Sequence, residues 1–227
     1  RPLKAYYTFI FAHTQPCASV FHAHFPTCFR SVNFLFVGMI FVLALTPIGY
    51  ITAGPIEITL IHIPVILGSF FLGLRGGLVL GFFFGLSSLL RALLVPTPLS
   101  MIMLGADTGF GLYNLLLVLA VLFLPRILVG FVSALLYRVL TPKKNVLGMM
   151  VASAAGSLTN TVLFLGILYL LAAPLVAQAF GTDVAGVAAI LFATTGLVNG
   201  GIEAVAAVLI CTAAGKALQS YMKRRTA

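Results

Sequence analysis

The sequence predicts an all-α integral membrane protein, a bundle of six transmembrane helices with both termini in the cytoplasm. Hydrophobic residues make up 61% of the 227 residues and charged residues only 7%, whereas soluble domains carry about 25% charged residues. Long apolar segments recur along the chain, and the basic residues fall on alternate connections between them. Since disordered chains are poor in apolar residues, the solvent for this much apolar surface is lipid.

A helix that crosses the bilayer needs about 20 mostly apolar residues, because the hydrocarbon core is about 30 Å thick. The apolar segments lie at residues 32–50, 58–74, 78–95, 115–140, 146–171 and 186–218. Turn-forming residues separate them at 52–57, 75–77, 96–114, 141–145 and 173–185. We therefore expect a cytoplasmic lead-in (1–30), a six-helix membrane domain (31–218) and a basic cytoplasmic tail (219–227).

The basic residues predict the orientation, because cytoplasmic loops carry an excess of Lys and Arg. If the N-terminus is inside, one side of the membrane receives Arg30, Arg75, Arg138, Lys143, Lys144, Lys216, Lys223, Arg224 and Arg225. The other side receives Glu57, Asp107 and Asp183, with Arg91 at the margin of one loop. This alternation predicts that both termini are cytoplasmic.

Several classes of function are excluded by the same pattern. The net charge is +9, but the basic residues sit between apolar runs instead of on one exposed face, so we expect no nucleic-acid partner. The lead-in contains His13, Cys17, His22, His24 and Cys28, at spacings that match no common zinc pattern, so we expect no metal. The chain has no Walker A motif and no catalytic constellation, so we expect no enzyme.

Two ionisable residues lie within apolar segments, where each costs about 2.5 to 3.5 kcal/mol on insertion scales. Arg126 lies twelve residues before Arg138, hence roughly 18 Å from the cytoplasmic end, in the outer half of the membrane. Glu203 follows Asn199 by one helical turn, so the two share a face. Either Arg126 and Glu203 form a structural ion pair, or Arg126 lines a cavity and binds a carboxylate bidentately. The two interpretations are compatible if Glu203 pairs with Arg126 and orients it toward the ligand.

Other polar and small residues allow two interpretations. A polar patch in the fifth segment serves either hydrogen bonding between helices or ligand binding; it consists of Ser157, Thr159, Asn160 and Thr161. His62, beside Pro64, is either a packed residue at a helix end or a ligand-binding residue. Glycines recur every four residues and permit close helix packing; they are Gly73, Gly77, Gly81 and Gly85.

Four stretches resemble the S components of energy-coupling factor (ECF) vitamin transporters, most closely the pantothenate-specific branch. They are 58–90 (ITLIHIPVILGSFFLGLRGGLVLGFFFGLSSLL), 125–140 (PRILVGFVSALLYRVL), 156–168 (GSLTNTVLFLGIL) and 199–204 (NGGIEA). The resemblance covers residues 32–218. It implies a six-helix bundle in the bacterial plasma membrane that binds a vitamin near the outer face, beneath the loops after helices one, three and five.

The resemblance also implies partners. S components work with a membrane T subunit and two cytoplasmic ATPases, whose use of ATP and Mg drives the S component to topple and release its vitamin inside. The chain itself is then expected to hold no cofactor. The first helix of the family usually docks on the T subunit through a small-x-x-x-small motif. Here only Gly38 is small, with Phe34 and Val42 at the flanking positions, so Gly38 is the docking candidate.

Pantothenate carries a carboxylate, two hydroxyls and an amide. We expect Arg126 to bind the carboxylate, with Arg91 as the alternative anion partner. The hydroxyl and amide groups are assigned to Asn160, Asn199 and Glu203, and His62 is a further candidate. The alternatives are another vitamin, such as pyridoxine, a thiamine precursor or folate. A membrane enzyme or a channel has no candidate constellation in this sequence.

Overall fold

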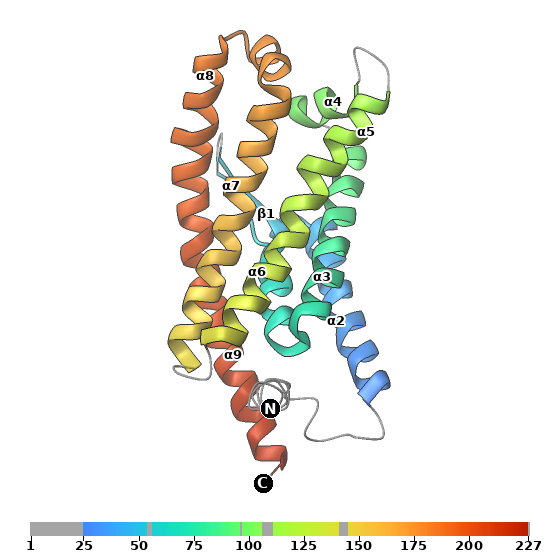
Figure 1. The fold of residues 1–227 in the computed structure, drawn as a ribbon, viewed down its shortest axis with the longest axis vertical. Coiled ribbons are helices and arrows are strands. Elements are labelled where there is room, and N and C mark those ends of the chain that lie inside the picture. Colours follow the sequence, from blue (N-terminus) through green and yellow to red (C-terminus); the bar gives the residue numbers. More distant parts are fainter. Residues whose placement is uncertain (1–24, 54–55, 96, 106–110, 141–144, 227) are drawn as a thin grey trace, which may run out of the picture.

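The computed structural model describes residues 25–53, 56–95, 97–105, 111–140 and 145–226. These fold into a bundle of long helices with a small hairpin between them (Figure 1). The elements are α2 (Phe25–Leu45), η1 (Pro47–Gly49), β1 (Tyr50–Ala53), β2 (Ile56–Thr59), α3 (His62–Leu94), α4 (Pro98–Leu104), α5 (Leu112–Val118), η2 (Leu119–Phe123), α6 (Leu124–Leu140), α7 (Asn145–Phe180), α8 (Val184–Ala188), η3 (Ala189–Asn199) and α9 (Gly200–Thr226).

The bundle has the surface of a membrane protein. Within the described residues, four helices are long and apolar enough to cross a bilayer: His62–Leu94, Leu112–Leu140, Val146–Gln178 and Val184–Ser220. Large apolar side chains cover the outside; Phe34, for example, is 81% exposed. Such a surface is stable only where lipid replaces water. The predicted helical membrane fold is confirmed.

The first helix and the stretch after it differ from expectation. Helix α2 begins at Phe25, earlier than predicted, and ends at Leu45, because Pro47 follows and the residue before a proline disfavours the helical conformation. The described residues of the turn-rich stretch 52–57 belong to two antiparallel strands, β1 and β2, in which Ala53 pairs with Ile56. The sequence pattern did not predict these two strands.

Helix α3 contains a sharp break. Gly73 has φ 67° and ψ −163°, a conformation essentially restricted to glycine. The chain folds back at this residue, so that Gly68 lies against the Leu80 side chain. The predicted connection at 75–77 was therefore wrong by two residues. Gly77 is instead used for packing, since a Cβ there would overlap the Gly130 carbonyl.

The glycine stripe holds α3 against the helix that carries Arg126. A Cβ at Gly81 would lie 2.5 Å from the Arg126 carbonyl oxygen, and one at Gly85 would lie 2.8 Å from the Phe123 ring. Both distances are far below van der Waals contact, so only glycine permits this approach. The predicted packing role is confirmed at Gly77, Gly81 and Gly85.

Two expected loops are shorter than predicted. Helix α7 continues through Pro174 to Phe180, so the loop expected at 173–185 was wrong; only residues 181–183 separate α7 from α8. Proline is tolerated in membrane helices because neighbouring groups and local adjustments satisfy the freed carbonyl. Within the loop expected at 96–114, the structure has the short helix α4, and α5 begins at Leu112.

Candidate ligand-binding site

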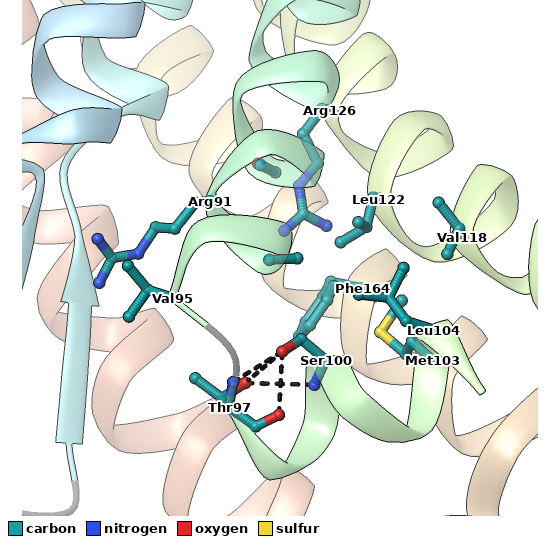
Figure 2. A pocket seen from close by; sticks show the side chains of 12 residues that line it. Arg91, Val95, Thr97, Ser100, Met103, Leu104, Val118, Leu122, Arg126 and Phe164 are labelled. Carbon is teal, nitrogen blue, oxygen red and sulfur yellow. Dashed lines mark hydrogen bonds between the residues drawn. The ribbon is translucent and has the colours of Figure 1, made fainter. Parts of the chain in front are cut away.

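A cavity of about 160 Å³ lies between the end of α3, helix α4, the continuous α5–η2–α6 helix and α7 (Figure 2). Its polar lining residues are Ser88, Arg91, Thr97, Ser100 and Arg126, and its apolar ones are Ala92, Val95, Met103, Leu104, Val118, Leu122 and Phe164. None of the described residues that line it is acidic. A mostly apolar cavity with basic and hydroxyl groups suits an organic anion.

Helix α4 closes one side of this cavity and is fixed by side-chain hydrogen bonds. Its first turn is capped reciprocally, because the Thr97 N–H donates to Ser100 Oγ (2.7 Å) and the Ser100 N–H donates to Thr97 Oγ1 (3.2 Å). At its other end, Asn114 Nδ2 on α5 donates to the Met103 carbonyl (3.2 Å). The hydroxyls of Thr97 and Ser100 are thereby held at the cavity.

Arg126 is the basic group whose position is best defined. Its Nη1 donates to the Val121 carbonyl oxygen at 2.7 Å. Its Cζ lies 4.6 Å from the centroid of the Phe164 ring and 5.6 Å from that of Phe84. A guanidinium over aromatic faces is attracted by the ring quadrupoles, most strongly where water is excluded. These contacts offset part of the cost of a charge at this depth.

Arg91 lines the same cavity, but its side chain takes another direction. Figure 2 shows Arg91 pointing away from Arg126, which extends toward the space above Ser100. The structure therefore brings both predicted anion partners to one cavity, and only Arg126 directs its guanidinium into the cluster of lining side chains.

Glu203 and His62 lie at the hairpin. Glu203, only 6% exposed, accepts a hydrogen bond through Oε1 from the Thr59 N–H at 2.7 Å. His62 is fully buried, its ring lies near the backbone of Thr59 and Glu203, and neither ring nitrogen makes a hydrogen bond of ordinary geometry within the described residues. Neither residue is among those described as lining the cavity.

The two asparagines lie where α7 meets the end of η3. Asn160 and Asn199 are both buried, and a Cβ at Gly200 would lie 2.7 Å from Thr161 Cγ2, so the two segments touch there. Thr159 Oγ1 donates to the Ala155 carbonyl of its own helix (2.6 Å). Asn160 lies one turn before Phe164 on α7, but neither asparagine is among the residues described as lining the cavity.

Some functional features were not predicted. The aromatic partners Phe84 and Phe164 and the hydroxyls on α4 carry no signal in an apolar sequence, whereas the proline immediately before Arg126 was a visible one.

Gly38 lies on an open part of α2, where a Cβ would meet nothing within 4 Å; its docking role stays a prediction. Within the described residues no group of three or more His, Cys, Asp or Glu side chains is arranged to hold a metal. His13, Cys17, His22 and His24 lie outside those residues.

Comparison with known proteins defines the class. Residues 35–211 match the family model of the ECF transporter, substrate-specific component. The match covers most of the chain, so the chain belongs to this family of transport components, which are not enzymes, and is a multi-pass protein of the bacterial cell membrane.

A known relative narrows the comparison. The chain is 34% identical to the pantothenic acid transporter PanT of Lactococcus lactis subsp. cremoris (strain MG1363) over 172 residues, which are 72% of this chain and 79% of the relative.

Proposed function

We propose that this chain is the pantothenate-binding subunit of an ECF importer. The observation that carries the proposal is the Arg126 guanidinium, which lies at a cavity whose described lining contains hydroxyls and no acidic group. A singly charged carboxylate complements this charge. The relative named as a pantothenic acid transporter supports the same substrate.

In this proposal the vitamin lies along the bundle axis. Its carboxylate binds Arg126, with Arg91 supplying a second positive charge at the cavity. Its hydroxyl and amide groups bind Asn160, Asn199, Glu203 and His62. Support for a polar ligand comes from Asn160 Oδ1 and Ser157 Oγ, which are buried with no hydrogen-bond partner among the described residues, since such atoms normally have a partner.

The proposal extends to topology and partners. Because α3 folds back at Gly73, its two arms count as two of the six membrane helices, and the others are α2, α5–α6, α7 and α8–α9. The first arm, residues 62–72, is shorter than a full crossing of the bilayer. The membrane domain then spans 31–218, between a lead-in (1–30) and a basic tail (219–227), with both ends in the cytoplasm. The T subunit docks on the face of α2 around Gly38, and two ATPase subunits, using ATP and Mg, drive release inside.

A binding panel tests the proposed substrate. The purified chain in detergent is titrated calorimetrically with pantothenate, pyridoxine, a thiamine precursor and folate, each in a separate experiment. The proposal expects saturable binding of pantothenate alone. Binding of another member of the panel in its place would move the assignment to that vitamin.

A further inference from the structure

Arg126 follows a proline in the interior of an apolar helix. In an α-helix the Val121 carbonyl accepts a hydrogen bond from the N–H of residue 125, but Pro125 has no N–H. The chain adopts the π-helical segment η2 immediately before this point, and Arg126 Nη1 donates to the Val121 carbonyl at 2.7 Å. Because Pro125 has no N–H, no donor at residue 125 competes for that carbonyl, and the Arg126 side chain binds it.

Two further contacts restrict the same side chain. The Phe164 ring, which also lines the cavity, lies 4.6 Å from Arg126 Cζ. The backbone at Arg126 is fixed by Gly81 of α3, where any Cβ would meet the Arg126 carbonyl. Arg126 is therefore fixed at its backbone, at Nη1 and at the guanidinium face that lies against Phe164. The hydrogen bond to Val121 uses one of the five N–H donors of the guanidinium.

We propose that Pro125 and Phe164 are positioning residues for anion recognition in this protein. The proline removes any competing N–H at residue 125, and the Val121 carbonyl and the Phe164 ring hold the Arg126 guanidinium at the cavity. The ligand then does not have to order a free arginine when it binds, which increases its affinity. This inference rests on the proposed function, because it needs an anionic ligand at Arg126.

The decisive variant is Pro125→Ala. It restores an N–H that competes with Arg126 for the Val121 carbonyl, and it favours the helix at the same time. We expect pantothenate to bind about tenfold more weakly, in line with the loss of one charged hydrogen bond, while the melting temperature stays equal or rises. Pro174→Ala is the matched control: Pro174 also lies within a helix, on its exposed side, and its loss should leave affinity unchanged.

A second pair of variants tests the ring. Phe164→Leu keeps apolar bulk but removes the aromatic face, and it should weaken pantothenate binding about fivefold. Phe164→Tyr keeps the face and should restore affinity. Every variant is also titrated with pantothenol, in which a CH₂OH group replaces the carboxylate. If Pro125 and Phe164 act by positioning Arg126, their replacement should weaken pantothenate binding much more than pantothenol binding.

The outcomes separate the two ideas. If the wild-type chain does not bind pantothenate, both the proposed function and this inference are overturned. If the wild-type chain binds it and Pro125→Ala binds equally well, only the inference is overturned. Equal losses for pantothenate and pantothenol would also overturn it, because they would mean that the cavity as a whole had changed.

Discussion

The Glu203 carboxylate on α9 accepts a hydrogen bond from the Thr59 backbone N–H at 2.7 Å, although the two residues are 144 positions apart in the sequence. Thr59 is the last residue of β2 and lies just before the start of α3. One buried side chain therefore attaches the hairpin to the final long helix.

Replacing Glu203 tests this attachment. Glu203→Ala leaves the Thr59 N–H without its acceptor, which costs about 1 to 3 kcal/mol of stability for a buried group. Glu203→Gln keeps an acceptor oxygen and should lose less. Thermal unfolding in detergent should rank wild type, Gln and Ala in decreasing order of melting temperature. An Ala variant as stable as wild type would contradict the role of this bond.

Arg126→Ala should weaken pantothenate binding by about 1.5 kcal/mol or more, because a charged hydrogen bond is lost. Arg126→Lys should restore only part of the affinity, since a lysine ammonium cannot bind a carboxylate bidentately. Calorimetric titration measures both. The control is Arg75→Ala, which removes an exposed arginine just after the break in α3; this variant should bind as wild type does. Unchanged affinity in folded Arg126→Ala would refute the assignment of the carboxylate.

Gly81→Ala should destabilise the bundle. Its Cβ would lie 2.5 Å from the Arg126 carbonyl oxygen and 2.6 Å from Ile127 Cα, and backbone atoms cannot move aside as a side-chain end can. Overpacking of this kind costs about 1 to 3 kcal/mol. Gly166→Ala is the control, since a Cβ there meets nothing within 4 Å and alanine favours the helix. The two variants should shift the melting temperature in opposite directions, or Gly166→Ala should leave it unchanged.

Gly73 should tolerate no other residue without cost. At φ 67° and ψ −163° a side chain carries strain of order 1 to 3 kcal/mol. Asparagine tolerates the ordinary left-handed helical region better than most residues, but the ψ of residue 73 lies outside that region, so asparagine should be strained there as well. Gly73→Ala and Gly73→Asn should therefore both lower the melting temperature, whereas Gly201→Ala, at an open position, should not. Wild-type stability of the Asn variant would show that the break has another conformation.

Hydropathy located the helical segments, because the length of apolar chain needed to cross a bilayer is fixed. It did not locate the break in α3, where Gly73, Gly76 and Gly77 all permit a turn. The choice depends on tertiary contacts, since Gly77 is needed against Gly130. For a similar reason the sequence predicts a loop that contains Pro174, although a proline on an exposed helix face can be accommodated.

The sequence predicts those site residues that carry a charge within an apolar segment, because a charge in lipid is energetically costly. Arg126 and Glu203 stood out for that reason alone, and the structure gives each a specific hydrogen-bond acceptor or donor. The direction of Arg91 and the approach of Phe164 to Arg126 were not predictable, because they depend on how three helices pack. The proline before Arg126 was visible in the sequence, but its meaning required the position of the Val121 carbonyl.

The fold-back at Gly73 has a mechanical consequence. A single residue reverses the chain, and the two arms lie in contact at Gly68 and Leu80, so there is no slack by which one arm can slide past the other. The second arm is in turn pressed onto α6 through Gly77 and Gly81. These pieces therefore form one close-packed unit, in which the two arms of α3 and helix α6 cannot shift relative to one another without separating backbone atoms that are in contact.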